Sequence, residues 1–281
     1  MAKDAVVGFI TGYNFDKLKP WVYSLIDSGF AGDKIVVIYE PVGADVVIKL
    51  EELGFKTLVL SKPEPFSIMV HRFYHLWWLL NNVEEKYRYV ITTDVADVIF
   101  QSNPSLHLSS FLKDNYCEIL ASEEGLKYRD EPWGDQNLRL SFGDTIHQTL
   151  RDEVICNAGV IAGKHEEMES LALNIFLACG GRPLHVPGGG GPDQAALNVI
   201  LNMIPWYHTT YKSNHKEGWA CQSGTVADPN KINEFRPHIV DCEPVWDGEF
   251  VKTPSGKKYV IVHQYNRVPE WKQVIEKRYD R

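Results

Sequence analysis

Residues 87–97 read YRYVITTDVAD, and this stretch decides the fold that the sequence predicts. Residues 87–92 are rich in β-branched and aromatic side chains, which is typical of a buried strand. Two carboxylates, Asp94 and Asp97, follow that strand at once. In parallel sheets, ligands bind at the carboxyl ends of the strands. The stretch therefore predicts a parallel sheet with a functional site at this edge.

Three more strands and three helices alternate before residue 87. The apolar runs that indicate strands cover residues 5–11, 34–39 and 57–60. Apolar side chains at helical spacing cover residues 18–26, 47–53 and 66–80. This β-α-β-α-β-α-β order predicts an α/β protein whose central sheet is mostly parallel and is flanked by helices on both faces.

The second half of the chain is less regular. It shows short strand-like runs at residues 118–121, 159–162 and 259–262, and helical spacing at residues 168–176 and 192–203. Residues 205–240 are predicted to be rich in loops. Since no linker divides the chain, we expect one Rossmann-like domain over residues 1–281. Residues 1 to about 100 would form its nucleotide-binding half, and residues from about 101 to 281 an irregular half that completes the metal and acceptor sites.

Composition excludes several classes of protein. The 281 residues include 29 basic and 37 acidic side chains, a net charge of −8, which disfavours a nucleic acid as the main partner. The five cysteines form no CxxC pair, which argues against a disulfide framework and a cysteine zinc site. Without a signal peptide or an apolar run of 18 residues, we expect no membrane span and a cytoplasmic protein.

The two carboxylates after the fourth strand indicate a metal site. Asp94 and Asp97 would repel each other when buried, and a hard divalent cation such as Mn²⁺ or Mg²⁺ removes that cost. His263 follows another strand-like run and is predicted to reach the same sheet edge as a third ligand, with Arg267 close behind to pair with phosphate. The alternative is a strand-end turn with one capping and one solvated aspartate, and this segment alone favours neither.

Other polar and small residues lie where a ligand would bind. Asn157 and Gly159 belong to a run of small residues (NAGVIAG) that lets backbone approach a ligand or another strand closely. Asp193 and Gln194 open a helix after four glycines, where they bind a ligand or merely cap the helix. Arg72, on the helix before the acidic strand, has the reach for a diphosphate or a strand-end carboxylate, against the default of a solvated helix face.

Strand ends elsewhere supply candidates for nucleoside binding. Thr11, Gly12 and Tyr13 end the first strand, and Tyr39 ends the second. The sequence has no GxGxxG and no GxxxxGK[ST] pattern, so neither a dinucleotide-binding nor a P-loop fingerprint is present. Three aromatic residues of the later loops, Trp206, Tyr211 and Trp219, are candidates for glycan contacts.

In their order along the chain, these residues resemble the A-type (GT-A) nucleotide-sugar glycosyltransferases, in particular the glycogenin-like and bacterial galactosyltransferase-like families. The residues that carry the resemblance are Thr11, Arg72, Asp94 with Asp97, Asn157 to Gly159, Asp193 with Gln194, and His263 with Arg267. One spacing departs from the family: its motif places the two aspartates two residues apart, and here they are three apart.

The resemblance implies a GT-A fold and a reaction. A nucleoside diphosphate sugar, most plausibly UDP-linked, would bind with Mn²⁺ or Mg²⁺ held by Asp94, Asp97 and His263. Additional charge compensation would come from Arg72 and from Arg267 or Lys212. The acceptor would be a glycan or another hydroxyl compound, as in glycan biosynthesis, and would bind near residues 123–136 and 205–224.

Roles at the donor sugar also follow from the resemblance. Asn157 and Gly159 would contact the sugar region, and Asp193 and Gln194 would lie near the anomeric carbon. The glycogenin-like order favours retention of configuration, in which the leaving phosphate takes the acceptor proton. For an inverting reaction, Asp193 is the candidate base.

Three other functions compete with this one. A sugar-phosphate nucleotidyltransferase has a basic glycine-rich loop after its first strand, which residues 12–16 (GYNFD) lack. A haloacid-type phosphatase would need a DxD spacing that the run DVADV does not give. A non-catalytic protein that binds a nucleotide sugar or a glycan remains compatible with the altered aspartate spacing.

Overall fold

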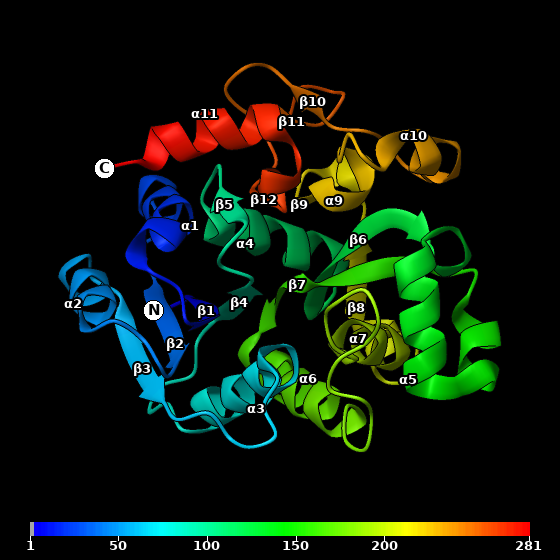
Figure 1. Ribbon diagram of the computed structural model, residues 1–281, viewed down its shortest axis with the longest axis horizontal. Helices are drawn as coiled ribbons and strands as arrows, with labels where there is room; N and C mark the ends of the chain where they lie inside the picture. Colours follow the sequence, from blue (N-terminus) through cyan, green and yellow to red (C-terminus); the bar gives the residue numbers. More distant parts are fainter. Residues whose placement is uncertain (1–2) are drawn as a thin grey trace.

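The computed structural model describes residues 3–281 and confirms the mixed α/β fold, with a large central sheet between two layers of helices (Figure 1). The strand order in this sheet is β3-β2-β1-β4-β7-β6-β8. Strands β1 to β4 run parallel, whereas β7 pairs antiparallel with both β4 and β6. The sheet is therefore parallel in its first half and mixed beyond β4.

The first half of the chain follows the predicted alternation. Its strands are β1 Ala5–Thr11, β2 Asp33–Tyr39, β3 Lys56–Leu60 and β4 Tyr89–Thr93. Its helices are α1 Phe15–Asp27, α2 Ala44–Glu52 and α3 Ile68–Asn81. Helices α1 and α2 pack on one face of the sheet and α3 on the other, in two separate hydrophobic cores.

Trp21 of α1 fixes the position of the acidic strand end. Its indole Nε1 donates to Thr93 Oγ1 over 2.8 Å, and its ring lies against β1 at Gly8. A side chain at residue 8 would collide with Trp21 and with Val95. The glycine therefore lets α1 approach the sheet where β4 ends, one residue before Asp94.

The second half departs from the prediction in extent. Strands β6 Ile119–Lys127 and β7 Val154–Lys164 are more than twice as long as the predicted runs, and β8 Thr210–Ser213 forms the edge of the sheet. The predicted strand over residues 159–162 begins too late, because Asn157 already lies inside β7. Its side-chain oxygen accepts the Gly159 N–H over 2.6 Å, and the β6–β7 register shifts beside it, which leaves room for a polar side chain in the strand.

Four longer helices surround this half of the sheet. They are α4 Pro104–Asn115, α5 Pro132–Leu150, α6 His165–Ala178 and α7 Asp193–Leu201. Helices α6 and α7 match the predicted helical spacing, whereas α4 and α5 were not predicted. Most of residues 132–150 are polar, and Gly143 interrupts the helical backbone at φ +78°. No regular apolar stripe therefore marks α5 in the sequence.

A small second sheet brings His263 to the acidic strand end. It contains β5 Val98–Phe100, β9 Ala220–Gln222 and β12 Ile261–His263, with β12 in the middle. In the antiparallel β5–β12 pair, His263 lies opposite Val98, the residue after Asp97. Strand pairing thus places a histidine from the end of the chain beside the carboxylate pair.

Short elements fill the predicted loop-rich region and the C-terminal part. They are α8 Trp206–Thr209, α9 Ser223–Val226, α10 Ile232–Phe235, β10 Val245–Trp246, β11 Val251–Lys252 and α11 Pro269–Tyr279. Four 3₁₀ turns cover Tyr128–Asp130, His215–Glu217, Arg236–His238 and Tyr265–Arg267. Helix α11 packs against α1 (Figure 1). Within residues 3–281, no helix combines the length and apolar character needed to cross a membrane.

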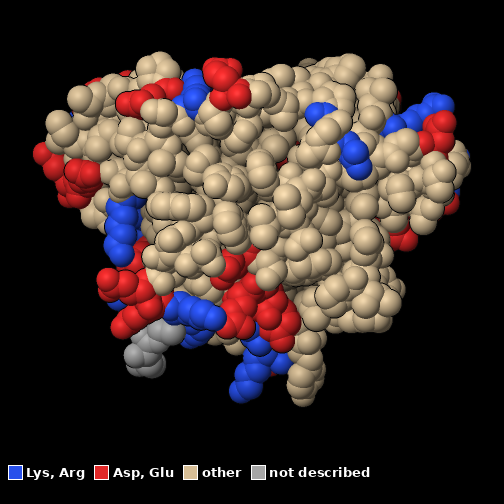
Figure 2. Space-filling view, turned by 90° about the horizontal axis from the view of Figure 1, so that it is seen from below, with Lys and Arg blue, Asp and Glu red and all other residues tan. Residues whose placement is uncertain are grey.

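Charged side chains of both signs share the surface. On the face shown in Figure 2, lysine and arginine side chains lie among aspartates and glutamates along the edges, and a broad middle area carries neither. In the whole sequence, acidic residues outnumber basic ones by eight.

Candidate active site

A cleft of about 580 Å³ opens at the carboxyl ends of β1 and β4. Residues from β4, β6, β7, α3, α7 and the β12 end line it, so both halves of the chain contribute. Among the predicted site residues, those in the lining are Tyr13, Arg72, Asp94, Asp97, Asn157, Gly159, Asp193, Gln194, His263 and Arg267. The fold therefore gathers ten of the thirteen predicted residues around one cavity.

Asp94, Asp97 and His263 form a cluster that fits a divalent cation. Each contributes a ligand atom, and these atoms lie within 4.8 Å of one another. His263 Nε2 is 3.4 Å from Asp94 Oδ2 and 3.7 Å from Asp97 Oδ1. His263 Nδ1 is 2.7 Å from Gln222 Oε1, so Nδ1 carries a hydrogen, and Nε2, which faces the carboxylates, would offer its lone pair to a bound cation. Two hard oxygens and an imidazole nitrogen suit Mn²⁺ or Mg²⁺.

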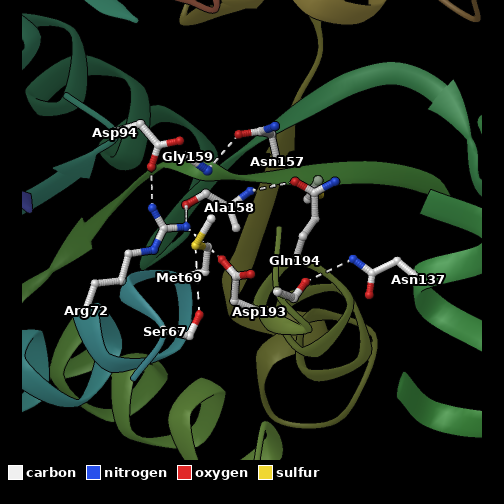
Figure 3. A network of polar contacts seen from close by, with 12 residues as sticks. Ser67, Met69, Arg72, Asp94, Asn137, Asn157, Ala158, Gly159, Asp193 and Gln194 are labelled. Carbon is white, nitrogen blue, oxygen red and sulfur yellow. Dashed lines mark hydrogen bonds and ion pairs between the residues drawn. The ribbon is translucent and has the colours of Figure 1, made fainter. Parts of the chain in front are cut away.

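Arg72 joins the metal cluster to the start of α7. Its guanidinium pairs with Asp94 Oδ1, and its Nη2 donates to Asp193 Oδ2 over 2.8 Å and to the Ala158 carbonyl over 3.0 Å (Figure 3). Of the two roles predicted for Arg72, the structure supports contact with a strand-end carboxylate. The arginine holds two side chains of the site in place.

The pKa values of the three carboxyl groups in the site are shifted in different directions. Burial opposes the charged form of Asp94, but Arg72 and then His263 outweigh it and lower the pKa of this carboxyl. Burial raises the pKa of Asp97, and the negative charge of Asp94 adds to this effect. Burial also raises the pKa of Asp193, although Arg72 opposes it. A cation beside Asp94 and Asp97 would relieve the cost of ionising both.

Gly159 lets β7 approach the metal cluster. A Cβ at this position would lie 2.5 Å from His263 Cε1 and 2.9 Å from Asp94 Oδ2. The Gly159 carbonyl also accepts the Asp94 N–H over 2.8 Å. The sequence analysis expected the backbone at this small residue to approach a ligand or another strand closely. In the structure, the backbone at Gly159 approaches Asp94 and His263.

Glu124 of β6 is a site residue that the sequence analysis missed. It is buried, lines the cleft, and its Oε1 accepts from Asn157 Nδ2 over 2.7 Å and from Gln194 Nε2 over 3.1 Å. Gln194 Oε1 in turn accepts the Ala158 N–H over 3.3 Å (Figure 3). The signal was the pair Glu123-Glu124 directly after an apolar strand, the same pattern that identified Asp94.

Replacing Glu124 by glutamine should change how stability depends on pH. Burial, followed by the charge of Glu131, raises the pKa of Glu124 from 4.5 to about 7. The folded protein then keeps a proton that the unfolded chain has lost, so stability falls as the pH rises from about 4.5 to about 7. Relative to Glu124→Gln, the wild type should lose about 3 kcal/mol of unfolding free energy between pH 5 and pH 8.

Urea unfolding of both proteins at several pH values measures this difference. Glutamine keeps the oxygen that accepts from Asn157 and Gln194, so the two proteins should be close in stability at pH 5. Parallel pH profiles for wild type and Glu124→Gln would show that Glu124 ionises in the folded protein as readily as in the unfolded chain.

The predicted nucleoside contacts are only partly at the cleft. Tyr13 lines it, as do the apolar side chains of Phe9 and Met69. Thr11 and Gly12 are not among the lining residues, and their role stays a prediction. The prediction that Tyr39 contacts the nucleoside is wrong. Tyr39 is completely buried, and its hydroxyl is 2.8 Å from His75 Nδ1 in the core beneath α3. Its side chain presents no atom to a ligand.

Other candidates for charge or stacking lie away from the cleft. Lys212 donates to Asn202 Oδ1 over 2.8 Å and is absent from the lining. Trp219 is completely buried and stacks on His107, so its glycan role is wrong, and Trp206 and Tyr211 also lie outside the lining. Among the tryptophans of residues 3–281, Trp133 is the one that lines the cleft.

Trp133 and a glycine strap form the outer wall of the cleft. The strap is residues 188–191, and Trp133 Nε1 donates to the Gly189 carbonyl over 3.0 Å. Gly188 and Gly190 have φ of +84° and +82° and lie against the indole, where a Cβ would come within 2.9 and 3.0 Å of it. Both predicted acceptor segments border the cleft: residues 123–136 through Glu124, Glu131 and Trp133, and residues 205–224 through Gly224.

Comparison with known proteins identifies the fold. No protein-family model matches the sequence, and no curated protein sequence matches it significantly. Mouse xyloside xylosyltransferase 1, in its apo form, superposes with a TM-score of 0.52 at 12% identity, covering 92% of this chain and 97% of that one. The galactosyltransferase LgtC, in complex with donor and acceptor sugar analogues, superposes with a TM-score of 0.54 at 13% identity, covering 92% and 86%. Both are GT-A glycosyltransferases, and the chain has their fold.

Proposed function

We propose that this chain, which has the GT-A fold, is a metal-dependent glycosyltransferase. It moves a sugar from a nucleoside diphosphate sugar, most plausibly UDP-linked, to a hydroxyl group of a glycan or another acceptor. The observation that carries the proposal is the cluster of Asp94, Asp97 and His263 inside the cleft at the carboxyl edge of the sheet. Residues 1–281 act as one catalytic domain, with the nucleotide on the β1–β4 side.

The metal cluster and the cations around it serve the diphosphate. When bound, Mn²⁺ or Mg²⁺ would neutralise phosphate oxygens and stabilise the leaving group. Arg267 and Lys231 also line the cleft and supply positive charge for phosphate. Arg72 acts differently, because it is engaged by protein carboxylates: it holds Asp94 in orientation for the cation.

A polar wall beside the metal cluster would bind the donor sugar. Glu124, Asn157 and Gln194 are linked to one another by hydrogen bonds and all line the cleft. These side chains offer both donors and acceptors to sugar hydroxyls, and their mutual bonds keep them oriented. Glu124 thereby joins the donor-sugar residues inferred from the sequence.

Retention of configuration is the stereochemistry that we infer. An inverting reaction needs a base, and Asp193 is the candidate. One of its carboxylate oxygens accepts from Arg72 over 2.8 Å, which reduces its availability for a proton. In a retaining front-face reaction, the leaving phosphate takes the proton of the acceptor hydroxyl, and Asp193 needs only to orient the sugar.

A thermal-shift screen of nucleotide sugars tests the proposal. A donor present at about 100 times its Kd stabilises the folded protein by about 2.7 kcal/mol, which corresponds to a rise in Tm of about 5 °C or more. We expect UDP-sugars to produce this rise with Mn²⁺ and a much smaller one with EDTA. GDP- and CMP-sugars are the comparison. If no nucleotide raises Tm under either condition, the proposal is wrong.

A further inference from the structure

A buried histidine–aspartate pair lies behind the metal cluster and outside the cleft lining. The His215 side chain is completely buried and that of Asp241 nearly so. Asp241 Oδ2 is 2.8 Å from His215 Nδ1 and accepts the His215 backbone N–H over 2.7 Å. The proposed function as stated so far uses neither residue.

The pair holds the backbone of β9 at Gln222. His215 Nε2 accepts the Gln222 N–H over 3.1 Å. Since Nε2 accepts and Nδ1 faces a carboxylate, the network assigns His215 as a neutral imidazole with its hydrogen on Nδ1. Its ring therefore connects Asp241 to β9 in one orientation.

Gln222 passes this constraint to the metal ligand. In the parallel β9–β12 pair it lies in register with His263, and its Oε1 accepts from His263 Nδ1 over 2.7 Å. Gln222 is completely buried, and within residues 3–281 its amide nitrogen has no hydrogen-bond partner. The side chain therefore acts on the site through its oxygen alone.

Gly125 provides the space for the pair. Its φ is +75°, and a Cβ there would lie 3.0 Å from Asp241 Oδ1 and 3.2 Å from the His215 ring. The Gly125 carbonyl accepts the Val240 N–H over 2.9 Å, next to Asp241. The pair is thus packed between β6, just after Glu124, and the strand beside the metal ligand.

We propose that Asp241, His215 and Gln222 form a positioning chain that fixes His263 with Nε2 directed at the cation. The inference rests on the proposed metal site. Partners of this kind set the tautomer and ring orientation of a histidine ligand, and their loss weakens metal binding by about 10- to 100-fold. A residue such as Asp241, remote from the cleft, would then tune metal affinity.

Mn²⁺ affinity of Gln222 variants, measured by electron paramagnetic resonance without nucleotide, tests the chain. Gln222→Met keeps the side-chain length and removes the acceptor, so its Kd for Mn²⁺ should rise about 10-fold or more. Gln222→Glu keeps the acceptor oxygen, so its Kd for Mn²⁺ should stay within about 3-fold of the wild-type value. Asp241→Asn and His215→Ala should weaken binding in the same direction.

A second histidine–aspartate pair, in which the His147 side chain is buried and that of Asp135 is about one-third exposed, is the control. His147 Nε2 lies 2.7 Å from Asp135 Oδ1 on α5, and neither residue lines the cleft. His147→Ala should lower Tm while leaving the Mn²⁺ affinity unchanged. Equal affinity of Gln222→Met and wild type, or an equal loss in His147→Ala, would overturn the positioning chain. If the wild type itself binds no Mn²⁺, the proposed function fails first and the chain fails with it.

Discussion

Replacing Asp94 by asparagine is expected to lower kcat/KM for sugar transfer by about 10³-fold. Asp94 Oδ2 faces His263 Nε2, and Asp94 Oδ1 pairs with Arg72. Asparagine keeps the shape but offers no negative charge to the cation, so the charge on the leaving phosphate would be poorly compensated. Release of nucleoside diphosphate from the donor, with and without acceptor, measures the loss.

Asp4 provides the control for this substitution. It is a buried aspartate at the opposite end of the sheet, and its Oδ2 accepts from Arg88 Nη2 over 2.7 Å. Asp4→Asn also weakens an arginine–aspartate pair, yet it should leave kcat/KM within about 2-fold of the wild type, because it lies outside the cleft. Similar turnover in Asp94→Asn and Asp4→Asn would contradict a role for Asp94 in holding the metal.

Replacing Arg72 by methionine should produce a large loss of stability. The Arg72 side chain is 12% exposed and pairs with Asp94 and with Asp193, whose side chain is 7% exposed. Its removal leaves the buried Asp193 carboxylate without its partner, which costs about 3–5 kcal/mol, while Asp94, whose side chain is 37% exposed, keeps His263. Urea unfolding at pH 7.5 measures this, and the loss should shrink as the pH is lowered, because burial raises the pKa of Asp193 and Arg72 no longer opposes that shift.

Arg139 is the control, since it pairs with Asp144 and both side chains are more than half exposed. Arg139→Met should cost about 1 kcal/mol or less. Adding Asp193→Asn to Arg72→Met should restore part of the lost stability, because one of the unpaired charges disappears. If Arg72→Met is as stable as Arg139→Met, Arg72 does not hold the two carboxylates as described.

The sequence predicts the first half of the fold well because strands buried on both faces are continuously apolar. The edge where such strands end was also predictable, and with it the position of Asp94 and Asp97. His263 follows from the same rule, since it ends a strand-like run. Its actual placement depends on the antiparallel register with Val98, which no local pattern contains.

The second half was harder to predict because its strands carry buried polar residues. Glu124 and Asn157 lie inside β6 and β7 and hydrogen-bond to each other across the sheet. Locally, each reads as lying outside a strand, so the predicted strand 118–121 ends before Glu124 and the predicted strand 159–162 begins after Asn157. Tyr39 fails for another reason: a strand-end residue can point to either face, and this one points into the core under α3.

Release of nucleoside diphosphate by the wild-type protein, freed of metal and then titrated with Mn²⁺, tests the central claim most directly. The account predicts background release in EDTA and a rise that saturates with Mn²⁺ for one UDP-sugar, faster with an acceptor. It is contradicted if donors bind but are never turned over, or if turnover is the same with and without Mn²⁺.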